Sequence, residues 1–216
     1  MHMDLCGPFC PQARGGYRYF LVLVDDTTRQ GFTYLLKEKS EAQHHINLLI
    51  LQIEKQYPGR EVRTLRSDGG GEFIGKPFQQ WLGAKGITQQ ITVPYSPQQN
   101  GVAERRNATL LDTMRTLLAW SGLSEEWWGE VVLAANDLTN HLSSTVLPEN
   151  ISPQEAWSGK KPTVEGLRVF GCQAVIWTPK EHRTSKAAPV GQRVIHIRKD
   201  EQAKGYLFYN PKTRKT

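Results

Sequence analysis

The chain has 216 residues, and its 27 Lys and Arg against 21 Asp and Glu give a net charge of +6 and a pI of about 9.3. No apolar run approaches the roughly 18 residues that a membrane span needs, and the start lacks a charged-then-apolar signal segment. These features exclude a membrane-spanning or secreted protein, so we expect a soluble, intracellular one. The mild basic excess fits contact with phosphate backbones but is not specific to it.

Three cysteines form no even disulfide framework, and no nearby histidine completes a zinc-ligand spacing. We therefore expect reduced thiols. Cys6 and Cys10 are interpreted as small buried side chains, with metal ligation as the less favoured alternative.

The first half of the chain predicts strands that alternate with helices. Two β-branched and aromatic runs, Tyr17 to Asp25 and Gly31 to Lys37, predict a hairpin. Ser40 has capping-box spacing to Gln43 and begins a predicted amphipathic helix that Pro58 ends.

A second strand and helix pattern follows. The expected elements are a strand at Glu61 to Arg66, a helix at Lys76 to Lys85 and a strand at Ile87 to Val93. The turn-forming residues from Pro94 to Gly101 predict a loop.

Two further helices are predicted, from Val102 to Trp120 and from Ser124 through Leu138. After about Pro162 the pattern changes to short strand-like pieces, namely Arg168 to Thr178, Arg193 to Ile197 and Gly205 to Tyr209. We therefore expect an α/β fold for residues 1–162, a mixed sheet with helices on both faces, and a small β module for residues 163–216.

Three acids stand at positions that functional sites favour. Asp4 lies near the start, Asp68 ends a strand in a glycine-rich turn, and Glu104 falls in the first turn of a long helix. Strand ends and helix starts meet at one edge of an open α/β sheet. The spacing of Glu104 to Leu111 and Leu118 predicts a carboxylate that points inward.

Each acid also has an ordinary structural explanation. Asp68 could be a turn aspartate, Glu104 a helix N-terminal acid favoured by the dipole, and Asp4 has little local support. Asp25 and Asp26 end a strand and are rival metal ligands, although turn capping is the commoner role. Converging carboxylates are what Mg²⁺ needs, and paired ions about 4 Å apart support displacement at phosphorus.

Three segments resemble the integrase core of copia-type LTR retrotransposons: residues 2–8 (HMDLCGP), 65–73 (LRSDGGGEF) and 94–105 (PYSPQQNGVAER). Thirty-five residues separate Asp68 from Glu104, the D-x35-E spacing of these integrases. The likeness continues in order at Trp127 to Val132, Ser152 to Pro162 and Leu167 to Gly171, and so covers nearly the whole chain.

The resemblance implies a ribonuclease H-like fold with a five-stranded mixed sheet, followed by a small SH3-like β module. It assigns Asp4, Asp68 and Glu104 as catalytic residues and metal ligands for Mg²⁺ or Mn²⁺, with two ions expected. It implies trimming of retroelement DNA ends by water attack, then joining of 3′ hydroxyls to target DNA. DNA contacts are expected from Gln98, Asn100, Arg105 and Arg106, the arginines being otherwise solvated helix residues.

The implied partners are double-stranded DNA and further copies of the chain, at least as a dimer, with nuclear localisation. No membrane and no small-molecule substrate are expected. The chain departs from the family in lacking the preceding zinc-binding domain, in a first strand cut almost to Asp4, and in Ile195 to Arg198, where the family has a glycine-tyrosine pair. We therefore expect a truncated core and an incomplete β module. The alternatives are a catalytically inactive nucleic-acid-binding fragment and another ribonuclease H-like nuclease or transposase.

Overall fold

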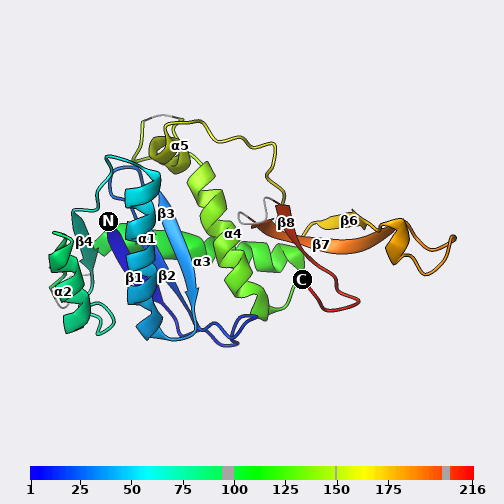
Figure 1. Ribbon diagram of the computed structural model, residues 1–216, viewed down its shortest axis with the longest axis horizontal. Helices are drawn as coiled ribbons and strands as arrows, with labels where there is room; N and C mark the ends of the chain where they lie inside the picture. The colour runs from blue at the N-terminus through cyan, green and yellow to red at the C-terminus, as the bar shows by residue number, and fades with distance from the viewer. Residues whose placement is uncertain (94–99, 149, 201–204) are drawn as a thin grey trace.

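A mixed sheet of five strands forms the centre of the molecule (Figure 1). The computed structural model describes residues 1–93, 100–148, 150–200 and 205–216. The strands lie in the order β3-β2-β1-β4-β5, with the first three antiparallel and the last two parallel to β1. Their bounds are β1 (His2–Cys6), β2 (Tyr19–Val24), β3 (Gly31–Leu36), β4 (Thr64–Ser67) and β5 (Thr88–Ile91).

Helices cover both faces of this sheet (Figure 1). They are α1 (Ala42–Gln56), α2 (Lys76–Ala84), α3 (Gly101–Ser121), α4 (Trp128–His141) and α5 (Pro153–Ser158), with 3-10 turns η1 (Lys39–Glu41), η3 (Glu125–Trp127) and η4 (Lys180–His182). The alternating side chains of β2 divide the core: Leu21 and Leu23 pack with α1, and Phe20 and Val22 pack with α3 and α4. Burial on both faces explains why β2 is continuously apolar in sequence.

The first strand is longer than the sequence suggested. β1 pairs with β2 over its full length, with Asp4 opposite Val22 in the middle of the ladder. The ladder to β4 extends to the first residue, because the Arg66 N–H donates to the Met1 carbonyl and the Met1 amine donates to the Thr64 carbonyl. Asp4 therefore lies within a fully paired strand, although only three residues precede it in the sequence.

The start of α1 also differs from the prediction. The side chain of Glu41, not that of Ser40, satisfies free backbone donors there, accepting from the N–H groups of Lys37 and Glu38. The Ser40 hydroxyl instead bonds to the carboxylate of Glu38. A single turn, η1, precedes the helix, so the sequence placed the cap at the wrong residue.

A separate antiparallel sheet contains β6 (Gln173–Trp177), β7 (Gly191–Asp200) and β8 (Gly205–Tyr209), in that order. The first of these strands begins at Gln173, not at Arg168 as expected. Figure 1 shows β7 beside α4, where the Arg198 Nε lies 2.6 Å from a carboxylate oxygen of Glu130. The boundary between residues 162 and 163 stays a prediction.

Two further expectations from the sequence concern membrane-spanning helices and the three cysteines. No helix in the described parts of the chain is long and apolar enough to cross a membrane. The three cysteines are free, as expected, but Cys10 is exposed and Cys6 only half-buried. The interpretation of both as buried thiols is wrong for Cys10.

Candidate functional site

The register of two parallel strands brings Asp4 and Asp68 to the same level of the sheet. His2 of β1 is opposite Arg66 of β4. Asp4 lies two residues after His2, and Asp68 lies two residues after Arg66, directly after the end of β4, so the two acids come to a similar level of the sheet. Asp4 is on the face that α3 covers, because it is opposite Val22, which packs in the α3 and α4 core.

Asp4 is held by two hydrogen bonds within a partly dry environment. Its Oδ1 accepts the Leu5 N–H at 2.9 Å, and its Oδ2 accepts the side-chain amide of Asn107, on α3, at 2.7 Å. Burial, together with the charges of Asp68 and Glu104, raises the pKa of Asp4 to about 6, against the lowering effect of the two hydrogen bonds. The three acids therefore lie close enough to act on one another electrostatically.

Asp68 projects from a compact turn that is fixed to the core. Its Oδ1 accepts the Gly70 N–H at 3.1 Å, while its side chain is exposed. Phe73 is fully buried, donates its N–H to the Gly70 carbonyl, and accepts a 2.6 Å hydrogen bond from Gln89 on β5. The turn thus presents a free carboxylate from a rigid base.

Glu104 lies in the first turn of α3, and its side chain is exposed. The prediction that Glu104 points inward is wrong. It relied on a face shared with Leu111 and Leu118, and these two side chains are only half-buried. The buried stripe is offset along the helix and contains Ala103, Arg106, Asn107, Leu110 and Met114. Glu104 therefore lies on the exposed side of α3, and its charge still acts on Asp4.

The three carboxylates have the chemistry of a hard-cation site. Oxygen donors with unbalanced negative charge suit Mg²⁺ or Mn²⁺. A divalent cation would relieve the mutual repulsion that, together with burial, raises the pKa of Asp4. Among the described residues, however, no group of three His, Cys, Asp or Glu side chains is already gathered to hold a metal ion. The carboxylate oxygens suit such a cation. The exposed side chains of Asp68 and Glu104 would have to move toward Asp4 to bind the same ion.

The four residues expected to contact DNA fall into different environments. Gln98 lies outside the described residues. Asn100 is buried and donates to the Met3 carbonyl at 3.0 Å, and Arg106 is buried against α4, so neither is on a surface that DNA can reach. Both expectations are corrected, and so is the alternative of a solvated Arg106. Arg105 is exposed beside Glu104.

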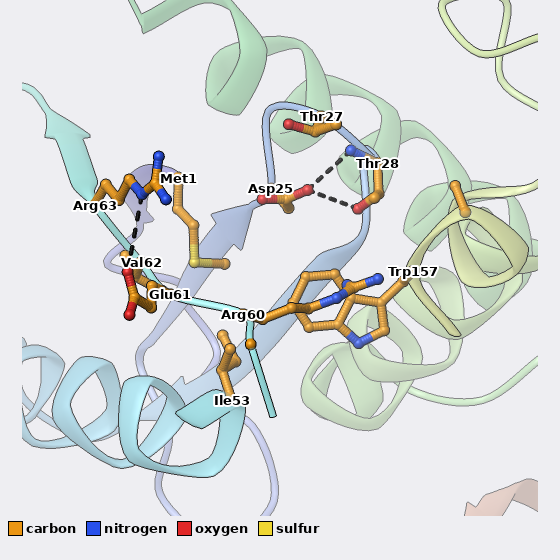
Figure 2. A pocket seen from close by; sticks show the side chains of 12 residues that line it. Met1, Asp25, Thr27, Thr28, Ile53, Arg60, Glu61, Val62, Arg63 and Trp157 are labelled. Carbon is orange, nitrogen blue, oxygen red and sulfur yellow. Dashed lines mark hydrogen bonds and ion pairs between the residues drawn. The ribbon is translucent and has the colours of Figure 1, made fainter. Parts of the chain in front are cut away.

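The rival acids have structural partners. Asp25 Oδ2 accepts both the N–H and the hydroxyl of Thr28 at 2.8 Å, so Asp25 caps the turn between β2 and β3. Asp26 pairs with Arg29 at 2.7 Å. Figure 2 shows Asp25 in the wall of an open pocket where Arg60 lies over Trp157, and neither Asp4, Asp68 nor Glu104 lines this pocket.

Comparisons with known proteins decide the family. A family described as "Integrase core domain" matches residues 1–97, and one described as "Retroviral polymerase SH3-like domain" matches residues 172–216. The whole chain is 35% identical to the retrovirus-related Pol polyprotein from transposon TNT 1-94 of Nicotiana tabacum. A segment covering 74% of the chain is 32% identical to the retrovirus-related Pol polyprotein from transposon RE2 of Arabidopsis thaliana. The chain belongs to the integrases of copia-type Pol polyproteins. It spans 16% and 11% of these two polyproteins.

Solved structures confirm the integrase fold. The chain is similar to one in the simian T-cell lymphotropic virus intasome in complex with PP2A regulatory subunit B56 gamma, with a TM-score of 0.58, 17% identity and coverage of 96% of this chain and 74% of that one. It is also similar to the HTLV-2 integrase catalytic core domain in complex with magnesium, in a trimeric form, with a TM-score of 0.52, 15% identity and coverage of 72% and 93%. The expected five-stranded core and SH3-like module are both present.

Several residues around this candidate site were missed in the sequence. Asn107 holds Asp4, and Asn136 and Asn140 of α4 hold Arg106. The available signal was the position of Asn107 one turn after Glu104, which puts both near one face of α3. The two asparagines of α4 are four residues apart, which gave a shared face but no indication of a partner.

Proposed function

We propose that this chain is the catalytic part of a metal-dependent strand transferase, which trims retroelement DNA ends and joins their 3′ hydroxyls to target DNA. Membership of the integrase family supports DNA integration. The single observation that carries the finer proposal is the raised pKa of Asp4, to which the charges of Asp68 and Glu104 contribute. This electrostatic coupling supports a shared site for an acid of β1, an acid of the turn after β4 and an acid of α3.

A pair of Mg²⁺ or Mn²⁺ ions would be held by Asp4, Asp68 and Glu104. When bound, these ions would activate an attacking oxygen and stabilise a leaving oxygen at phosphorus. The chain's own contribution is to orient the carboxylates. The Leu5 N–H and the Asn107 amide fix both oxygens of Asp4, and the Gly70 N–H fixes one oxygen of Asp68. The Asp68 side chain is exposed.

The test is joining of a labelled DNA duplex to target DNA with Mg²⁺ or Mn²⁺. Glu104→Gln is expected to reduce joining by on the order of a thousandfold, because it removes a charge that the transition state needs. Glu125→Gln, an exposed acid in η3, is the matched control and is expected to retain joining.

Two other outcomes distinguish the alternatives. Salt-sensitive DNA binding without nicking or joining by the unaltered chain would favour the inactive nucleic-acid-binding fragment. The exposed, unassembled positions of Asp68 and Glu104 give that alternative some support. Cleavage without joining would instead favour another ribonuclease H-like nuclease.

Arg105 is the remaining described candidate for a phosphate contact, being exposed next to Glu104. Arg105→Ala is expected to weaken duplex binding about threefold at moderate salt and to reduce the salt slope by about 1, equally for all sequences. Fluorescence anisotropy over a salt series measures both quantities. Arg63→Ala, an exposed arginine at the other end of β4, is the control. An unchanged slope would remove Arg105 from the DNA interface.

We further propose that the chain acts as a homo-oligomer on chromosomal DNA in the nucleus. The support is indirect: one structural neighbour is described as trimeric and another as an intasome. Light scattering at working concentration tests the first point, since a monomer contradicts it. Fluorescent tagging in cells tests the second.

A further inference from the structure

A buried arginine without a carboxylate partner lies two residues after Glu104. The Arg106 side chain is 8% exposed, and burial alone lowers its pKa to about 10, with no contribution from any described carboxylate. It is thus still protonated at neutral pH. Its Nε is buried without a hydrogen-bond partner among the described residues.

The positive charge is held by neutral groups of α4. One terminal nitrogen of Arg106, Nη2, donates to the side-chain oxygens of Asn140 at 2.6 Å and Asn136 at 2.7 Å. The amide nitrogens of the same two asparagines donate to the Gly31 carbonyl at 2.8 and 3.1 Å. The Gly31 N–H in turn donates to Asn140 at 2.9 Å. The cluster of Arg106, Asn136, Asn140 and Gly31 therefore ties α3 and α4 to the first residue of β3.

This cluster is a costly way to join two helices. Removing a charge from water is unfavourable, and well-packed apolar residues commonly replace buried ionic groups without loss of stability. A buried polar cluster does, however, fix one arrangement of its elements, because each donor needs its particular acceptor. Stability alone thus gives a poor account of Arg106, and geometry gives a better one.

We propose that Arg106 is a positioning residue that sets the rotation of α3 about its axis, and thereby holds Glu104 beside Asp4 and Asp68. The inference rests on the proposed function of that site. Residues two apart on a helix point to nearly opposite sides. Anchoring the buried side at Arg106 therefore fixes the direction of the exposed Glu104.

A second contact of α3 shows which side of the helix faces Asp4. Asn107, one turn after Glu104 and close to the same face, donates to Asp4 at 2.7 Å. A rotation of α3 that broke the contacts of Arg106 would move both Asn107 and Glu104 relative to Asp4. The contacts of Arg106 and Asn107 therefore brace the helix from two directions.

Gly31 provides an independent way to disturb the cluster. A methyl group at this position would lie 2.7 Å from Cζ of Arg106 and 2.7 Å from Oδ1 of Asn136, and closer still to Nη2 of Arg106. The guanidinium would have to move, while Arg106 itself stayed unaltered. Gly83, where an added methyl group meets nothing within 4 Å, is the matched glycine control.

The test measures Mn²⁺ affinity by electron paramagnetic resonance titration of the full chain with a DNA duplex, which needs no turnover. Arg106→Met and Gly31→Ala are each expected to weaken Mn²⁺ binding about tenfold, and Gly83→Ala to leave it unchanged. Thermal melting of every variant shows whether it is folded at the titration temperature.

A double-mutant cycle separates positioning from general loosening. If Arg106 acts through Glu104, Arg106→Met has little further effect on Mn²⁺ affinity in a Glu104→Gln background. Equal, additive losses in both backgrounds would overturn the inference, as would unaltered affinity in folded Arg106→Met and Gly31→Ala. If Arg106→Met does not fold, the same cycle with Gly31→Ala decides.

Failure of the proposed function gives a different result. If the unaltered chain binds no Mn²⁺ with or without DNA, the metal site itself is contradicted, and the role of Arg106 with it. If the unaltered chain binds Mn²⁺ and joins DNA but the cluster variants match it, only the inference about Arg106 is wrong.

Discussion

Asp4→Asn is expected to have two opposite effects: at least about a thousandfold loss of metal-dependent joining, and a more stable fold at neutral pH. Burial and two acidic neighbours raise the pKa of Asp4 from 3.8 to about 6, so its charged form is unfavourable in the folded state. Each unit corresponds to about 1.4 kcal/mol, and solvent screening of this half-buried group reduces the gain to about 1–2 kcal/mol. Urea unfolding at pH 7.5 measures it.

The surroundings of Asp4 can accept an amide. The Oδ1 of the new side chain can still accept the Leu5 N–H. Its amino group would face Asn107, whose own Oδ1 is buried without a hydrogen-bond partner in the described structure. Rotating the Asn107 amide would supply that acceptor. The rotated Asn107 would then have its Nδ2 unpaired in place of its Oδ1, so the charge is removed while the number of unpaired amide atoms at Asn107 stays the same.

The pH dependence gives a second measure of the same effect. Because the folded pKa of Asp4 lies above the unfolded value of 3.8, the folded state binds the proton more tightly. The resulting stabilisation is fully present below about pH 3.8 and is lost as pH rises through 6. The unaltered chain should therefore gain stability relative to Asp4→Asn as pH falls from 7 to 4. A constant difference over that range would show that Asp4 is not perturbed.

Two of the candidate carboxylates could be proposed from the sequence because they lie in local sequence motifs. Asp68 follows a strand in a glycine-rich turn, and Glu104 opens a helix at the family spacing. What the sequence could not provide was register. Only the pairing of His2 with Arg66 shows that Asp4 and Asp68 lie level, and this pairing joins residues 64 apart in the chain.

The errors share a physical cause. The inward direction of Glu104 was predicted from helical periodicity, and Arg106 was expected at the surface as a DNA contact. The buried face of α3 is instead set by contacts with α4 and β3, which local spacing does not encode. A buried charged residue is especially hard to anticipate, because Arg is rarely buried. Its acceptors, Asn136 and Asn140, lie thirty or more residues away.

The second large effect concerns the base of the Asp68 turn. Phe73→Ala is expected to destabilise the fold by about 3–5 kcal/mol, because Phe73 is fully buried in the core beneath α1 and the cavity would not refill completely. Ile74→Ala is the matched control: Ile74 is 42% exposed, and a loss below about 1 kcal/mol is expected there. Equilibrium urea unfolding of both variants gives the two values.

The same pair of variants links packing to the site. The buried ring of Phe73 anchors a backbone segment whose N–H and carbonyl bond to Gly70 and Gln89, and the Gly70 N–H in turn orients Asp68. At a temperature where Phe73→Ala remains folded, it should therefore join DNA more slowly than Ile74→Ala, because Asp68 is held less firmly. Equal joining by the two folded variants would mean that the backbone of the turn positions Asp68 without the aromatic anchor. A loss of joining that followed the unfolded fraction alone would assign Phe73 a purely structural role.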